Sequence, residues 1–175
     1  KEAFPNNWAT TQNNLGTAYS KRILGDTAEN LELAIAAFQN ALEVCTKEAF
    51  PNNWATIQNN LGVAYSNRIK GDATENLELA IAAYQNVLEV YTKEAFPTDW
   101  ATIQNNLGEA YRNRILGDTA ENLELAIAAY QNALLVRTQD AFPTDWATTQ
   151  NNLGEACSRR IKGDTADNIE KAIAA

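Results

Sequence analysis

The sequence predicts an all-α fold, an α-solenoid in which antiparallel helix pairs stack on one another. The first observation is a repeat, because the tetrapeptide Asn-Asn-Leu-Gly begins at Asn13, Asn59, Asn105 and Asn151, always 46 residues apart. A fixed period of this length is typical of proteins whose units each bury an apolar face against their neighbours. The second observation is that apolar residues within each unit recur at intervals of three and four, which is helical spacing.

The second unit shows how each helix pair is expected to form. Its apolar residues follow helical spacing from residue 54 to 69 and from 77 to 91, which indicates two helices of roughly 20 residues, each about 30 Å long. Gly71 fits the C-terminal cap of the first helix because glycine tolerates the left-handed conformation. Asp72 and Glu75 form an Asp-x-x-Glu pattern that is expected to start the second helix.

Prolines indicate the boundaries between units. Pro97 cannot lie inside the preceding helix, so a new unit begins there, with Thr98, or Asn52 in the preceding unit, as the possible N-cap. Because the chain starts within one unit and stops within an expected helix, we expect a fragment of a longer protein. The chain is then a single repeat array with units at about residues 5–46, 47–92, 93–138 and 139–175.

Each first helix contains a glycine at an interior position, such as Gly62, where glycine costs about 1 kcal/mol relative to alanine. A close approach of the second helix, whose facing stripe carries Ala80 and Ala83, is the expected reason. Trp54 and Tyr65 are then expected to fill the remaining gaps in the core.

Composition excludes several classes of partner and site. A net charge of −8 argues against nucleic acid or an anionic membrane as the main partner, and the apolar runs are too short to span a membrane. Cys45 and Cys157 lie in different units and on different helices of the unit, so we expect two free thiols and a reducing, cytoplasmic location. Without histidine, a Gly-rich phosphate loop or a nucleophile constellation, no catalytic, metal-binding or cofactor-binding residue is expected.

The residues of the unit resemble a known family. Leu15-Gly16-x-x-Tyr19, followed by Ala34, Phe38 and Ala41, is similar to the tetratricopeptide repeat, although the unit has 46 residues rather than roughly 34. The Asn-Asn-Leu-Gly segment is similar to the longer repeats of kinesin light chains and of bacterial multidomain arrays. The resemblance implies a right-handed superhelix whose first helices line a concave groove. It also implies that this groove binds an extended peptide or a partner helix, without catalysis.

A helical wheel of the first helix, with Trp8, Leu15 and Tyr19 facing the core, separates candidate site residues from the frame. Several positions on the opposite face vary between units. One interpretation is an ordinary solvent-exposed face whose sequence varies freely. The other is a binding surface whose residues differ between units while the frame stays constant. In the second interpretation the candidate peptide-binding residues are Asn13, Asn59, Asn105, Asn151, Thr17, Val63, Glu109, Glu155, Arg112, Lys21, Asn67, Asn113 and Arg159.

Two ladders of residues recur unchanged in the four units. The first asparagine of each tetrapeptide lies on the groove face, where a row of amides can pair with the backbone N–H and C=O groups of a bound peptide. The alternative is that Asn13, Asn14 and their equivalents bond to each other across repeats. For Arg22 and its equivalents, an inter-helix ion pair with an acidic residue such as Glu32 is favoured over phosphate binding.

The sequence therefore favours a non-catalytic protein–protein interaction scaffold with an asparagine-lined groove for an extended peptide or a partner helix. The alternative function is structural self-assembly, in which near-identical units stack end to end between chains. An enzyme, a nucleic-acid binder and a membrane protein are not expected.

Overall fold

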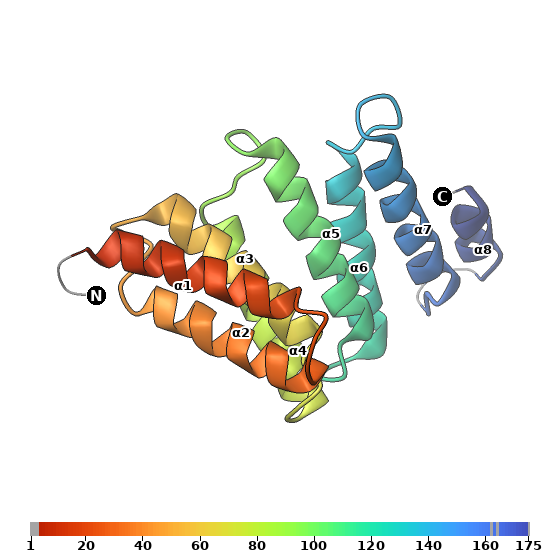
Figure 1. Cartoon of the computed structure of the whole chain (residues 1–175). Helices are drawn as coiled ribbons and strands as arrows, with labels where there is room; N and C mark the ends of the chain where they lie inside the picture. The colour runs from red at the N-terminus through yellow and green to blue at the C-terminus, as the bar shows by residue number, and fades with distance from the viewer. Residues whose placement is uncertain (1–3, 162, 164, 175) are drawn as a thin grey trace. The chain divides into compact units, whose positions relative to one another are not determined.

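The computed structural model describes residues 4–161, 163 and 165–174, and the side chain of residue 166 lies outside the description. Within these residues the regular secondary structure consists of eight α-helices (Figure 1). The chain divides into two compact units, Lys1–Val90 (unit 1) and Tyr91–Ala175 (unit 2), which are described separately below. This architecture confirms the predicted α-solenoid of sequential helix pairs.

Unit 1 contains two antiparallel helix pairs. Helix α1 (Pro5–Ser20) packs against α2 (Thr27–Leu42), and α3 (Pro51–Ser66) packs against α4 (Ala73–Leu88). The two pairs are joined by contacts of α3 with both α2 and α1. This arrangement means that the first helix of one pair covers both helices of the pair before it.

Unit 2 repeats the same arrangement, and its helices lie side by side in chain order (Figure 1). Helix α5 (Pro97–Asn113) packs against α6 (Thr119–Leu134), and α7 (Pro143–Ser158) packs against α8 (Thr165–Ala174). Contacts of α7 with α6 and α5 join the two pairs.

The helix ends correct several expectations. Helices α1 to α4 have 16 residues each, about 24 Å, rather than roughly 20 residues. Helix α3 ends at Ser66 and α4 ends at Leu88, so Ile69 and Tyr91, which were predicted to belong to these helices, lie outside them. Gly71 has the left-handed φ of +83°, but it lies in the connecting loop rather than at the helix C-cap. The apolar spacing continued past each helix and made the predicted helices too long.

Helix starts were predicted in part. Asp72 is the N-cap of α4 and its side chain accepts a hydrogen bond from the backbone N–H of Glu75, as the Asp-x-x-Glu pattern predicts. This bond lowers the pKa of the Asp72 carboxyl. Thr98 and Asn52 are not N-caps; Phe96 and Phe50 occupy those positions without a side-chain cap bond, and proline follows directly as the first helical residue. Proline satisfies this position because it has no N–H to leave unpaired.

The interior glycine of each first helix faces an aromatic ring rather than the predicted alanines. An ideal Cβ built on Gly62 lies 2.7 Å from Cε1 of Tyr84, and one on Gly16 lies 2.6 Å from Cε1 of Phe38. In these helix pairs, an aromatic ring of the second helix therefore packs directly against the backbone of the first helix at the glycine. Tyr65 fills the core as expected, whereas Trp54 is half-buried.

The arginine ladder forms ion pairs between successive helix pairs, as favoured by the sequence. Nε and Nη2 of Arg68 donate to the two carboxylate oxygens of Glu32 at 2.7 and 2.8 Å, and Arg160 makes the same two bonds to Glu124. The guanidinium lowers the pKa of Glu32 and the carboxylate raises that of Arg68. Cys45 and Cys157 are both free and buried.

Candidate functional site

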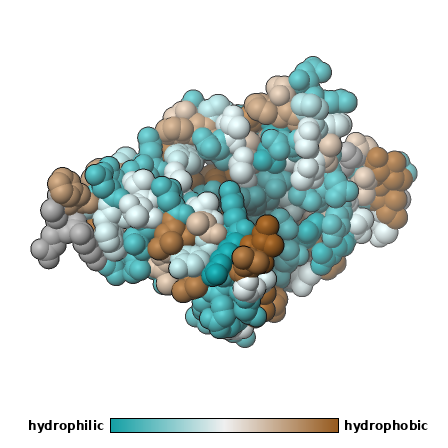
Figure 2. Space-filling model, viewed as in Figure 1, coloured by the Kyte–Doolittle hydropathy of each residue, from teal (hydrophilic) through white to brown (hydrophobic). Residues whose placement is uncertain are grey.

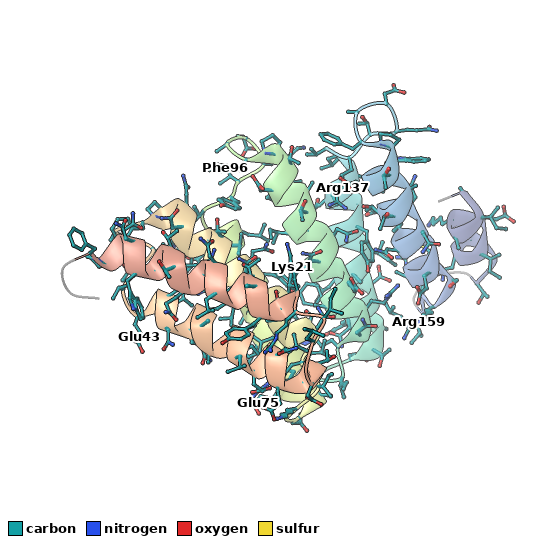
Figure 3. The ribbon with its side chains drawn as sticks, in the orientation of Figure 1. Lys21, Glu43, Glu75, Phe96, Arg137 and Arg159 are labelled. Carbon is teal, nitrogen blue, oxygen red and sulfur yellow. The ribbon has the colours of Figure 1, made fainter. Side chains whose placement is uncertain are left out.

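Four of the predicted site residues meet in one cavity of unit 1, which we call the unit-1 pocket. It has a volume of about 530 Å³ and lies between the C-terminal ends of α1 and α3. Thr17 and Lys21 line it from the α1 side, and Val63 and Asn67 from the α3 side. Lys21 lies at the end of α1 (Figure 3). The remaining lining residues are Ser20, Thr27, Leu31, Phe38, Asn60, Ala64 and Ile69.

The unit-1 pocket combines an apolar interior with a polar edge. Buried Phe38 and Leu31 line it from α2, while Val63 and Ile69 are 39% and 63% exposed. The hydroxyls of Thr17 and Ser20 bond to backbone carbonyls of their own helix. Their methyl and methylene groups and the aliphatic residues therefore offer apolar contact. Volume and lining both match the class of cavities that receive small ligands or single side chains.

In unit 2 an ion pair links the residues at two equivalent lining positions. Arg112 corresponds to Ser20 and Glu155 to Val63, each 92 residues later, and Arg112 Nη1 lies 2.5 Å from Glu155 Oε2. Only 11% of the Arg112 side chain is exposed, so the guanidinium fills space beside Tyr130, the equivalent of Phe38. The same positions thus line an apolar cavity in unit 1 and carry a largely buried ion pair in unit 2.

Two buried polar atoms beside this ion pair lack hydrogen-bond partners among the described residues. Tyr130 Oη and Arg112 Nε are buried and make no hydrogen bond with the described residues. Burial raises the pKa of the Tyr130 hydroxyl well above its usual value. A buried donor without an acceptor costs about 1–3 kcal/mol, so the burial of these two groups lowers the stability of unit 2.

The asparagine ladder makes the cross-repeat bonds that formed the alternative prediction. Nδ2 of Asn60 donates to Oδ1 of Asn13 at 3.0 Å, and Nδ2 of Asn152 donates to Oδ1 of Asn105 at 3.4 Å. The Asn59 Oδ1 is buried and has no partner among the described residues. Asn151 is exposed. The carbonyl oxygens of Asn13 and Asn105 therefore serve the frame.

The other predicted residues lie at the surface of unit 2. Glu109 and Asn113 are exposed on α5, and Arg159 is exposed at the C-terminal end of α7 (Figure 3). Arg159 Nη1 is 4.0 Å from Glu155 Oε1, so Glu155 faces two arginines. Unit 2 thus presents charges where unit 1 presents an opening.

A buried polar cluster around Arg137 was missed by the sequence reasoning. The guanidinium donates to the hydroxyls of Thr149 at 3.0 Å and Thr102 at 3.1 Å, and Thr149 donates onward to Asn105. Burial lowers the pKa of Arg137, and only 8% of the residue is exposed. The sequence did contain a signal, because two positions change together: unit 1 has the apolar residues Cys45 and Ile57 where unit 2 has Arg137 and Thr149.

Two further observations concern metals and membranes. Among the described residues, no group of three His, Cys, Asp or Glu side chains is placed to hold a metal ion. In the part of the chain that the structure describes, every helix is too short or too polar to cross a membrane.

Comparison with known proteins adds a family. The family model described as tetratricopeptide repeat matches residues 54–93, which span α3, α4 and the following loop. A search of curated proteins found no match. The matched segment is one helix pair, and the same 46-residue pattern and helix pairing recur along the chain. The match and the recurring helix pairs together support a repeat of the tetratricopeptide type.

Proposed function

We propose that the chain is a non-catalytic protein–protein interaction scaffold that binds an extended peptide or a partner helix. The asparagine-lined face of its first helices is the proposed binding surface, and the unit-1 pocket is the proposed anchor point. The family supports protein partners in general. The observation that carries the more specific proposal is the open cavity of about 530 Å³, which collects Thr17, Lys21, Val63 and Asn67.

The lining indicates which part of a partner enters. Phe38, Leu31 and Ile69 provide apolar contacts that favour a large aliphatic or aromatic side chain. Burying such a side chain contributes about 1.5–3 kcal/mol. Lys21 is exposed at the edge and favours a carboxylate next to the inserted side chain. The proposed ligand is therefore a peptide segment with a bulky apolar residue beside an acidic one.

The asparagine ladder contributes backbone contacts in this proposal. Asn13 uses its Oδ1 for the frame, and its amide group still offers two N–H donors. Such donors hold a peptide by its carbonyl groups and do not select its side chains. The pocket selects instead, because its lining differs between units.

A peptide selected against the intact chain tests the proposal. A phage-displayed library of random peptides is enriched on the immobilised chain, and the dissociation constant of a selected synthetic peptide is measured by isothermal titration calorimetry. The double variant Ser20→Arg, Val63→Glu transplants the ion pair of unit 2 into the unit-1 pocket. We expect it to weaken binding about tenfold or more, equivalent to about 1.4 kcal/mol.

The matched control is Ser158→Arg, which makes the same substitution at the equivalent serine of α7. We expect this variant to bind the peptide as the wild type does. Equal binding by the wild type and the Ser20→Arg, Val63→Glu variant, with intact helical circular dichroism, refutes the pocket as the anchor point.

A further inference from the structure

Two pairs of asparagines join α1 and α3 along the line where these helices meet in unit 1, which we call the α1–α3 seam. Nδ2 of Asn53 donates to Oδ1 of Asn6, and Nδ2 of Asn60 donates to Oδ1 of Asn13, each at 3.0 Å. The pairs lie seven residues apart on each helix, from 6 to 13 on α1 and from 53 to 60 on α3. This separation corresponds to about 10.5 Å along the seam.

The outer pair, formed by Asn6 and Asn53, distinguishes unit 1 from unit 2. The equivalent positions in unit 2, 92 residues later, carry Thr98 and Asp145. The inner pair, in contrast, recurs in unit 2. Unit 1 therefore has amide groups at two levels of the seam, and unit 2 has them at one.

The asparagine pairs suit a ligand with an extended backbone. A primary amide has two N–H donors and one acceptor oxygen, so each pair keeps donors and an acceptor that the bond between the helices does not use. The N–H and C=O groups of an extended peptide are available to such partners, whereas a helix pairs these groups internally. Figure 2 shows mostly hydrophilic and neutral residues along α1, in keeping with recognition of a backbone.

A small cavity of about 70 Å³ lies between the two asparagine pairs. Its lining includes Asn53 from the outer pair, Asn13 from the inner pair, and the buried residues Ala9 and Ile57. This volume admits a small side chain such as that of alanine. The unit-1 pocket, with about 530 Å³, has room for the bulky anchor.

The unit-1 pocket continues the same seam toward the C-terminal ends of both helices. Its lining residues lie about eight positions further along α1 and α3 than those of the small cavity, a distance of about 12 Å. Side chains on one side of an extended chain recur every second residue, or about every 6.7 Å, so this distance corresponds to about four residues. One extended peptide can therefore fill both cavities at once.

We propose that the partner segment is an extended peptide that lies along the α1–α3 seam. A small residue of the peptide occupies the small cavity, and a bulky apolar residue four positions away occupies the unit-1 pocket. The two asparagine pairs bind the backbone on either side of the small cavity. This proposal rests on the proposed function, and it adds the path, the conformation and the residue spacing of the ligand.

Calorimetric titration with a synthetic peptide selected on the intact chain tests the spacing. The anchor is the peptide residue whose replacement by alanine abolishes the effect of the Ser20→Arg, Val63→Glu variant on affinity. Tryptophan at the fourth position from the anchor, on one side of it, is expected to weaken binding about tenfold or more, because the small cavity cannot hold it. Tryptophan at the third position on that side is the matched control, since its side chain points away from the seam.

A protein variant tests the backbone contacts. The double variant Asn6→Ala, Asn53→Ala removes the outer pair and is expected to raise the dissociation constant about tenfold through the loss of its hydrogen bonds to the peptide. The control Asn7→Ala, Asn52→Ala changes the neighbouring exposed asparagines, which belong to neither the pairs nor the lining of the small cavity. We expect the control to bind like the wild type, and circular dichroism verifies that both variants keep their helices.

The outcomes separate this proposal from the proposed function. A selected peptide that keeps its affinity for the Ser20→Arg, Val63→Glu variant refutes the anchor point and, with it, the path along the seam. A peptide that loses affinity there but binds the Asn6→Ala, Asn53→Ala variant as tightly as the wild type overturns the path alone. So does tolerance of tryptophan at the fourth position on both sides. Weakening at the eighth position instead of the fourth indicates a helical ligand and also overturns the path, because eight helical residues span about 12 Å.

Discussion

Replacing Gly62 by alanine tests the packing that holds each helix pair together. An ideal Cβ at this position lies 2.7 Å from Cε1 and 2.9 Å from Cδ1 of Tyr84. The Tyr84 side chain is 2% exposed, so its ring has no open space to move into. The added methyl group must therefore push the two helices apart or force the ring out of its rotamer.

The sign of the effect separates two explanations of the glycine. In an uncrowded helix, glycine to alanine is favourable by about 1 kcal/mol. Overpacking a filled core costs about 1–3 kcal/mol, so the net expectation for Gly62→Ala is a loss of about 1 kcal/mol in the free energy of unfolding. If no neighbouring group requires glycine at this position, alanine increases the free energy of unfolding instead.

Urea unfolding followed by circular dichroism at equal m-values measures this change, because a lower midpoint at constant slope reports lower stability. A second comparison sets the single variant Tyr84→Leu against the double variant Tyr84→Leu, Gly62→Ala. With the ring removed, we expect alanine to restore its usual advantage, so the double variant is more stable than Tyr84→Leu alone. A Gly62→Ala chain more stable than the wild type refutes the ring-on-glycine account.

Three further predictions follow from polar groups in the frame. Arg68 lowers the pKa of Glu32, so this pair adds stability above the unfolded carboxyl pKa and loses it as the pH falls through the folded one; Glu32→Gln should reduce the acid dependence of the melting temperature in that range, and an unchanged dependence contradicts the ion pair. The Tyr130 hydroxyl is buried without a partner among the described residues, so Tyr130→Phe should leave the urea midpoint unchanged or raise it, whereas a clear loss reveals a bond that the structure lacks. Thr149→Ile removes an acceptor from the buried Arg137 and should lower the free energy of urea unfolding by about 1–3 kcal/mol. Adding Arg137→Tyr should recover this loss. An unchanged free energy of unfolding for Thr149→Ile alone contradicts the prediction.

The repeat period and the apolar spacing were enough to predict the helix pairs and the arginine–glutamate pairs between them. Asp72 was predictable as a cap because its bond to Glu75 is local. The helix lengths were not, because Ile69 continues the apolar spacing in a loop that the pattern does not distinguish from a helix. The start of α3 at Phe50 was likewise not predictable, because Phe50 makes no capping hydrogen bond through its side chain that the sequence pattern could indicate.

The candidate site was predictable to the level of a face. Thr17, Lys21, Val63 and Asn67 were selected from a helical wheel, and they line one cavity. The ion pair between Arg112 and Glu155 was not predictable, since the two residues lie on different helices. The packing of the Tyr84 ring against Gly62 was missed for the same reason. A helical wheel gives the direction of each side chain around one helix, but it does not show how closely a side chain of the neighbouring helix approaches.

We propose that the same frame holds a peptide-binding pocket in unit 1 and an equivalent site in unit 2 that the Arg112–Glu155 ion pair blocks. The double variant Arg112→Ser, Glu155→Val removes the closing pair and restores the residue types found at Ser20 and Val63. Calorimetric stoichiometry with a peptide selected on the wild type tests the claim most directly. We predict one bound peptide per wild-type chain and two per variant chain. A variant that still binds one peptide, with unchanged affinity and intact helices, contradicts it.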